Sequence, residues 1–278
     1  VIVSLYIMVD LSTVIKCLVN KLGYKITNAE YIMSCISTWG AKLNVIVTSI
    51  STGIGVSLLP NIAADFSTKN YKELKNKTEN TIITLLFIVI PMVFGLSVLA
   101  SPVWNIFYGV NNLGVSVFSV SIFTALFCSL FNIVIIIMQS VNRYKKVYLC
   151  LVLGILTKII INVPMMLLFD KIGLSAYWGA SISTMLGYVI SLIVCFIDLK
   201  KQFNINVKEI LKSTLLSLIA AVIMFVVIYM LSHYINFGTS RFMSILEVIL
   251  YVIIGIIIYG GILFKTKTFK KILSNFRR

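Results

Sequence analysis

The residue types best suited to chemistry lie within one long apolar stretch. Lys158 stands near the middle of the apolar run Val147–Leu168. At about 1.5 Å rise per residue it is roughly 16 Å from either end of a helix there, too deep for its ammonium to reach the membrane surface. Gly154, Lys158 and Asn162 recur at every fourth position and share one helix face. Such a cationic stripe suits an anionic ligand, so we expect Lys158 and Asn162 to bind substrate. A structural lysine, paired with a carboxylate or a carbonyl, is the alternative.

A carboxylate inside another apolar run is the second candidate. Asp10 lies midway along the first run, between Ile2 and Leu18. An acidic group at that depth is energetically costly and often marks an ion path. Asp10 is therefore a candidate for ion coupling, or for pairing with a lysine or with residues in a missing part of the protein.

The sequence lacks the patterns of enzymes and of metal or cofactor sites. No group of His, Asp, Glu and Cys has catalytic or ligand spacing, and no glycine-rich phosphate loop is present. The 5 cysteines are scattered without a CxxC pair, as expected for small buried side chains. We therefore expect no enzymatic activity, no cofactor and no metal.

Composition defines the elements that must position these residues. Hydrophobic residues make up 59% of the 278 residues and charged residues 12%, against about 25% charged in soluble domains. The mean hydropathy is +1.03. The net charge of +15 resides in short loops and the C-terminal tail rather than in a basic stripe with aromatic residues, so no nucleic-acid partner is expected. The chain is predicted to be an all-α integral membrane protein.

Apolar runs of membrane-spanning length predict a bundle of about eight transmembrane helices. The predicted spans are Ile2–Leu18, Leu43–Ala64, Thr81–Ser101, Gly114–Met138, Val147–Leu168, Leu174–Ile197, Ser213–Leu231 and Phe242–Phe264.

The basic residues predict the orientation of the bundle. Of the 24 Lys and Arg residues, 17 fall in alternate loops and the tail on one side, and 6 fall on the other. Short loops rich in Lys and Arg face the cytoplasm. The C-terminus and the tail 265–278 are therefore expected there. The predicted outer loop Val19–Lys42 is an exception, because it carries three basic residues, Lys21, Lys25 and Lys42, and Lys16 directly precedes it.

Small residues at every fourth position predict close helix contacts. One stripe is Gly179, Ser183, Gly187 and Ser191, and a second is Ser49, Gly53 and Ser57.

The stretch Ser51–Gly109 resembles a known family of transporters. It reads STGIGVSLLPNIAADFSTKNYKELKNKTENTIITLLFIVIPMVFGLSVLASPVWNIFYG. A small-residue helix ending in LLP, a short polar linker and a helix with Pro91 at mid-span are similar to the polysaccharide-flippase branch of the multidrug/oligosaccharidyl-lipid/polysaccharide exporter superfamily. That branch includes the MurJ-type lipid II flippases and the stage V sporulation protein B group. Lys158 with Asn162, and GLSAYWGASISTMLGYVISLI, extend the resemblance over essentially the whole chain.

The resemblance implies a domain organisation. Family members have fourteen helices in two six-helix lobes plus a C-terminal pair. Residues 1–197 would form the second six-helix lobe, residues 198–264 a cytoplasmic linker with two extra transmembrane helices, and residues 265–278 a basic cytoplasmic tail. The N-terminal lobe of the same protein would then be a missing partner.

The resemblance also draws attention to Lys42. The lipid II flippases carry an Asp-Arg pair at the outer start of the eighth helix, which falls on Gly40 and Ala41 here. Lys42 is adjacent and would supply the positive charge, as a point charge rather than a two-pronged guanidinium.

The resemblance implies a flippase of the bacterial plasma membrane. Its substrate would be a polyprenyl-diphosphate-linked sugar precursor, peptidoglycan lipid II or a related polysaccharide unit, moved by alternating access among membrane lipids. A drug/cation antiporter of the same superfamily is one alternative, and a membrane glycan polymerase or ligase is another.

Overall fold

The fold is a bundle of membrane-length helices. The computed structural model describes residues 2–234, 238 and 240–264. Within these residues eight helical segments are long and apolar enough to cross a membrane, and no strand occurs. The predicted all-α architecture with eight spans is confirmed. The predicted tail 265–278 lies outside the described residues.

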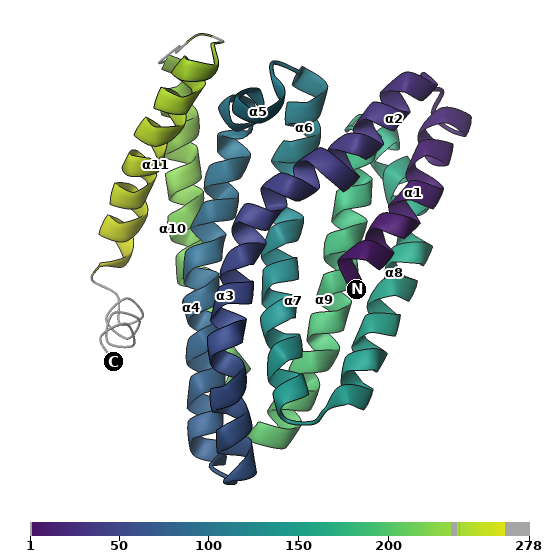
Figure 1. The fold of residues 1–278 in the computed structure, drawn as a ribbon. Helices are drawn as coiled ribbons and strands as arrows, with labels where there is room; N and C mark the ends of the chain where they lie inside the picture. The colour runs from purple at the N-terminus through teal and green to yellow at the C-terminus, as the bar shows by residue number, and fades with distance from the viewer. Residues whose placement is uncertain (1, 235–237, 239, 265–278) are drawn as a thin grey trace.

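Two of the eight spans, Ile26–Ser67 and Asn112–Ser140, consist of more than one helix (Figure 1). The elements are α1 (Ile2–Asn20), α2 (Ile26–Ser34), a π-helical turn η1 (Cys35–Trp39), α3 (Gly40–Ser67), α4 (Tyr71–Val98), α5 (Ala100–Tyr108), α6 (Asn112–Ser121), α7 (Phe123–Ser140), α8 (Tyr144–Lys171), α9 (Ala176–Phe203), α10 (Val207–Tyr234) and α11 (Arg241–Leu263).

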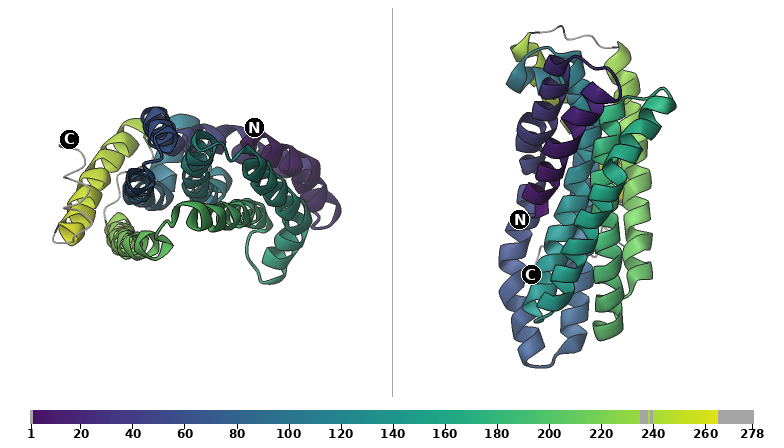
Figure 2. Two further views of the ribbon diagram at one scale, coloured as in Figure 1. Left: turned by 90° about the horizontal axis from the view of Figure 1, so that it is seen from below. Right: turned by 90° about the vertical axis from the view of Figure 1, so that its right-hand side faces the viewer.

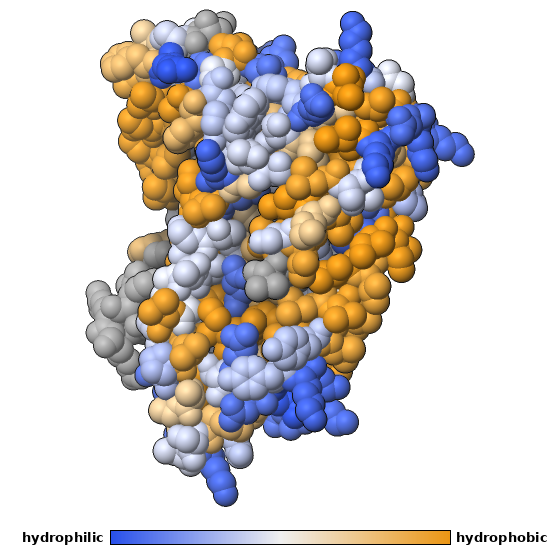
Figure 3. Space-filling model, turned by 45° about the vertical axis from the view of Figure 1, so that its right-hand side comes forward, coloured by the Kyte–Doolittle hydropathy of each residue, from blue (hydrophilic) through white to orange (hydrophobic). Residues whose placement is uncertain are grey.

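The helices form an elongated array. Helix α11 lies at one edge and α1 and α8 at the other, with α7 and α9 between them (Figures 1 and 2). Helix α10 packs on α4 and α11, while α1 packs on α2 and α8. On the face that Figure 3 shows, hydrophobic residues cover much of the middle, and hydrophilic residues gather mostly towards the two ends. This distribution matches a bundle whose middle faces lipid.

The predicted outer loop Val19–Lys42 is wrong for most of its length. Only a short connection separates α1 from α2, and the span that begins at Ile26 runs for 42 residues to Ser67. The polar residues of α2 lower its average hydropathy, but Ala29, Ile32 and Met33 are buried on one face of this helix. An amphipathic helix therefore forms where the apolar run alone indicated a loop.

A π-helical turn joins α2 to α3. The Gly40 N–H donates to the Cys35 carbonyl, five residues back. A Cβ at Gly40 would lie 2.5 Å from that carbonyl oxygen, so the turn needs glycine here. π-Turns are rare and frequently occur at functional sites.

The polar connectors Asp65–Asn80 and Asp198–Lys212 are shorter than predicted. Helix α4 already begins at Tyr71, where the Asn70 side chain accepts a hydrogen bond from the Glu73 N–H. Helix α9 continues to Phe203, and α10 begins at Val207. The helices extend past their apolar portions, because the polar segments at their ends also adopt helical structure outside the hydrocarbon core.

Ion pairs hold the Lys-rich ends of the helices together. Lys77 pairs with Asp65 at 2.6 Å. Arg143 donates through Nε and Nη2 to both oxygens of Asp198, at 2.9 and 2.6 Å. These bonds raise the pKa of the Arg143 guanidinium above its ordinary value. The bidentate pair ties the α7–α8 connection to α9.

The contact between α8 and α9 is the most extensive helix–helix contact among the described residues. A Cβ at Gly179 would lie 2.7 Å from the Met165 backbone, and Ser183 and Ser191 are fully buried. The first predicted small-residue stripe is thus confirmed as a packing face. The second stripe makes no helix contact within the described chain, because Ser49, Gly53 and Ser57 are exposed and a Cβ at Gly53 would meet nothing within 4 Å.

Candidate functional site

The Lys158 ammonium occupies a cage of oxygen atoms between three helices. The side chain is fully buried on α8. It forms an ion pair with Asp10 Oδ1 of α1 at 2.7 Å. Its other acceptors are Asn162 Oδ1 (3.0 Å), the Ala180 carbonyl (2.8 Å), Ser183 Oγ (3.0 Å) and Thr184 Oγ1 (2.7 Å). An ammonium has three protons, so these five acceptors share them.

Asn162 completes the network as a bridge. Its Nδ2 donates to Asp10 Oδ1 at 3.0 Å and to Thr13 Oγ1 at 2.7 Å. Its Oδ1 accepts from Lys158 and from Ser183, the latter at 2.6 Å. The amide therefore has donors facing α1 and its acceptor facing α8 and α9. The network joins α1, α8 and α9 through buried polar contacts.

The structure thus brings together three predicted site residues, Lys158, Asn162 and Asp10. The pairing of Asp10 with a lysine, left open by the sequence, is observed. The lysine is also paired with a carboxylate and a carbonyl, as the structural alternative requires. A buried charge needs such partners, because removing one member leaves an uncompensated ion.

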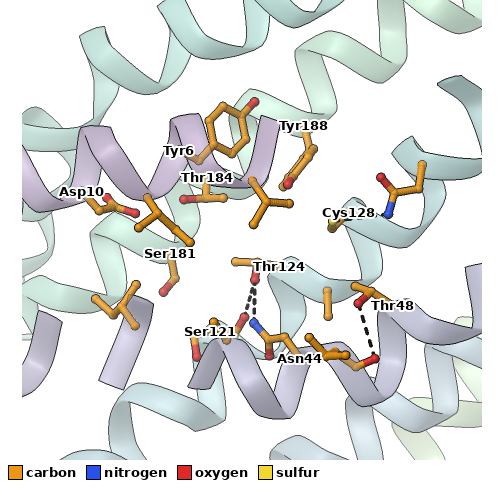
Figure 4. A pocket seen from close by; sticks show the side chains of 17 residues that line it. Tyr6, Asp10, Asn44, Thr48, Ser121, Thr124, Cys128, Ser181, Thr184 and Tyr188 are labelled. Atoms are coloured by element: carbon orange, nitrogen blue, oxygen red, sulfur yellow. Dashed lines mark hydrogen bonds between the residues drawn. The ribbon is translucent and has the colours of Figure 1, made fainter. Parts of the chain in front are cut away.

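A cavity of about 250 Å³ lies beside this network (Figure 4). Asp10 and Thr184 belong to both, whereas Lys158 and Asn162 do not line the cavity. Two lining residues, Val3 and Val45, are 43% and 59% exposed, so the cavity opens outward on the side of α1 and α3. The lining comprises Val3, Tyr6, Ile7, Asp10, Ile36, Ala41, Asn44, Val45, Thr48, Ser121, Thr124, Ala125, Cys128, Asn132, Ser181, Thr184 and Tyr188.

The cavity wall combines apolar surface with neutral polar side chains. Asn44 Nδ2 donates to Thr124 Oγ1 at 3.3 Å, and no hydrogen bond to Asn44 Oδ1 is present within the described residues. Figure 4 shows Asn44, Ser121 and Thr124 across the open space from Tyr6 and Tyr188. Hydroxyls and amides of this kind can donate to and accept from a sugar or a peptide.

Charge in the cavity wall is limited to Asp10, which Lys158 neutralises. Among the described residues, no lysine or arginine lines the cavity. Lys42 is exposed and lies one position beyond Ala41, a lining residue. The structure therefore does not bring Lys42 together with Lys158.

The polar cavity residues were not identified from the sequence. Their signal was present as pairs four residues apart inside apolar runs, namely Asn44 with Thr48 and Cys128 with Asn132. Serine and threonine are common in membrane helices, where they bond to their own backbone, as Thr48 does to Val45. Which of them face a common space depends on the packing of five separate elements.

A second hollow, the apolar groove, lies on the other side of α3. It has a volume of about 470 Å³ and is bounded mainly by α4, α10 and α11, with residues such as Pro91, Met224 and Ile256. Val45 lines the cavity and its neighbour Ile46 lines the groove. Helix α3 thus separates a polar space from an apolar one.

Metal-binding and redox features are sparse in the described part of the chain. No three His, Cys, Asp or Glu side chains there come close enough together to hold a metal ion. The described cysteines are all free and buried, with the Cys150 and Cys195 sulfur atoms 3.1 Å apart.

Comparisons with known proteins agree with this fold. A protein-family model described as lipid II flippase MurJ matches residues 38–251. The lipid II flippase MurJ of Bacillus subtilis (strain 168) is 28% identical over 265 residues, which cover 92% of this chain and 47% of that protein. A solved structure of lipid II flippase MurJ in an inward closed conformation superposes with a TM-score of 0.70 at 15% identity, over 95% of this chain and 51% of that one. The chain thus spans about half the length of the relatives that it matches.

Proposed function

Since the chain belongs to the MurJ family of lipid II flippases, we propose that it is the second lobe of a flippase for a polyprenyl-diphosphate-linked sugar precursor. The observation that carries the proposal is the pairing of a polar cavity with an apolar groove across α3. A lipid-linked sugar is itself divided into a polar head and a long apolar chain. Each part has a matching surface here.

The cavity receives part of the sugar-peptide head in this proposal. Asn44, Thr124 and Thr184 offer hydrogen bonds without a fixed charge. The groove between α4, α10 and α11 takes the prenyl chain, since its lining is almost entirely hydrocarbon. Moving the chain from lipid into the groove exchanges one apolar surrounding for another, so the groove positions the tail while the head supplies specificity.

The charged residues have separate roles in the proposal. Lys158 and Asn162 hold Asp10 and Thr184 at the cavity wall, and either residue reaches the substrate only when the ion pair with Asp10 opens. Asp10 is the ion-coupling candidate, because a cation or proton on its carboxylate would compete with Lys158. Lys42 is the exposed cation nearest the cavity in sequence and the candidate for the diphosphate.

A second lobe completes the transporter in this proposal. Residues 1–197 form one six-helix lobe, and the helices of residues 198–264 form the added pair. The N-terminal lobe of the same protein closes the open side of the cavity, between α1 and α3. The two lobes rock about the enclosed site, as alternating access requires. The protein resides in the bacterial plasma membrane with its C-terminus in the cytoplasm.

Complementation tests the proposed function. The complete reading frame is expressed in a bacterium depleted of its own lipid II flippase, and growth and outer-leaflet lipid II are measured. Rescue is expected. Failure with the protein shown to be in the membrane would contradict lipid II as the substrate.

Two further strains test the role of Lys158 and the need for a second lobe. Lys158→Ala is expected to abolish rescue while the protein still inserts, and normal flipping by this variant would exclude a role for Lys158. Rescue by residues 1–278 alone would contradict the two-lobe mechanism.

A further inference from the structure

A separate cleft lies between α9 and α10, and we refer to it as the rear cleft. Its volume is about 600 Å³, and helices α4 and α7 form its floor. Exposed aliphatic side chains line it, including Ile193 and Ile197 of α9 and Leu211 and Leu218 of α10. A single cationic residue, Lys200, completes the lining.

The rear cleft is distinct from the cavity. Helix α7 directs Thr124, Cys128 and Asn132 to the cavity but Phe127 and Leu130 to the rear cleft. At about 100° per residue these sets lie on opposite faces of the helix. A molecule in the rear cleft therefore does not touch the cavity wall.

The cleft exists because two consecutive helices diverge. Only Asn204 to Asn206 connect α9 to α10. Beyond that connection, α10 packs on α4 and α11 rather than along α9. Isoleucine and leucine side chains from both helices are left facing the wedge without packing on each other. An occupant of the wedge would complete this packing.

The dimensions fit one lipid chain from one leaflet. The lining of α10 runs from Val207 to Leu218, which is roughly 16 Å of helix at about 1.5 Å per residue. Half of a hydrocarbon core of about 30 Å is of the same length. An acyl chain anchored at the Lys-rich end would therefore fill the wedge.

The charge at the mouth selects the headgroup. Lys200 lies in the last turn of α9 and is exposed. Its ammonium has no hydrogen bond or ion pair within the described residues. The apolar groove at α11, by contrast, has no charged lining residue in the described chain. A phospholipid carries a phosphate at one end of its acyl chain, so the phosphate can pair with Lys200 while the acyl chain contacts the apolar lining.

We propose that the rear cleft binds one anionic glycerophospholipid of the leaflet that the Lys-rich loops face. One acyl chain lies between α9 and α10, and the phosphate pairs with Lys200. The lipid thereby fastens the α10–α11 pair to the rest of the bundle. This site is additional to the substrate surfaces and does not depend on transport.

Native mass spectrometry of the purified full-length protein tests the site. The probe is phosphatidylglycerol, titrated from mixed micelles, with phosphatidylcholine as the neutral reference. One tightly bound phosphatidylglycerol is expected. Lys200→Gln should weaken it about fivefold, the effect of one lysine near an anionic lipid surface. Lys201→Gln is the matched control, because Lys201 is exposed and outside the cleft lining, and it should leave the bound lipid in place.

A variant with a bulkier side chain distinguishes lipid binding inside the cleft from general electrostatic attraction of lipid to the protein surface. Thr214→Phe fills the wedge and should weaken phosphatidylglycerol and phosphatidylcholine alike, with an unchanged circular dichroism spectrum showing that the bundle is folded. Equal losses with Lys200→Gln and Lys201→Gln would mean that only general surface charge attracts the lipid. Displacement of phosphatidylglycerol by a polyprenyl diphosphate would make the cleft part of the substrate path. Either result would overturn the proposal.

Discussion

Lys158 has a full set of partners, and this property determines how its substitution should behave. Its ammonium and the Asp10 carboxylate are both withdrawn from solvent and joined at 2.7 Å. Breaking such a pair from one side costs about 3–5 kcal/mol, whereas replacing both members by neutral groups is often nearly neutral. Stability should therefore depend on the match between the two positions more than on either residue alone.

The double variant Asp10→Asn/Lys158→Met tests this match. Lys158→Met alone should lower the melting temperature strongly, because the buried Asp10 loses its cationic partner. Adding Asp10→Asn should restore most of that loss, as measured by thermal unfolding in detergent. Lys171→Met is the control, since Lys171 lies at the exposed end of the same helix. Additive losses from the two substitutions would show that the residues are not coupled.

Sequence reasoning found these residues individually but not their association. Lys158 and Asn162 share a face through helical spacing alone. The contact between Asn162 and Asp10 spans 152 positions and depends on how α1 packs against α8. Burial depth identified three polar residues as unusual, and tertiary packing determined that they belong together.

At the scale of elements, two glycines can be compared: Gly179 lies at the α8–α9 contact and Gly53 lies on an exposed face of α3. Gly179→Ala should destabilise the protein by about 1–3 kcal/mol, the usual cost of inserting a group into a packed interface. The obstacle is the Met165 backbone, which cannot rotate away. Gly53→Ala should be neutral or stabilise by up to about 1 kcal/mol, because alanine favours helix and space is free. Equal shifts in melting temperature would contradict the observed packing.

The two small-residue stripes also show what spacing can establish. Both have the same fourfold repeat, yet one is buried and the other exposed. The repeat identifies a face that permits close approach, but the partner helix determines whether the approach occurs. In the middle of α3 the buried small residues are Ser51 and Gly55 instead, on a neighbouring face that packs against α7.

At the scale of the whole molecule, the number and order of spans followed from apolar length alone. The errors were at helix ends, where polar residues continue a helix beyond the hydrocarbon, and in α2, whose apolar residues occupy only one face. Hydropathy averages over all faces, so it detects a helix surrounded by lipid better than one that is half polar.

The proposed orientation can be tested with single cysteines. Asn112→Cys lies near the α5–α6 connection and Gln202→Cys near the Lys-rich end of α9, and both native side chains are exposed. A membrane-impermeant maleimide should label position 112 in intact cells and position 202 only after permeabilisation. The described native cysteines are buried, so their background should be small. The reverse pattern would contradict a cytoplasmic C-terminus.

The long separation between Asp10 and Asn162 has a consequence for biogenesis. A ribosome adds about 5–20 residues per second, so the intervening 152 positions take on the order of ten seconds to synthesise. Helix α1 therefore enters the membrane with its carboxylate long before its partners on α8 and α9 exist. Until they arrive, Asp10 must remain protonated, stay near the interface, or be shielded by an insertion factor. The buried network is complete only when α8 and α9 have been synthesised and have packed against α1.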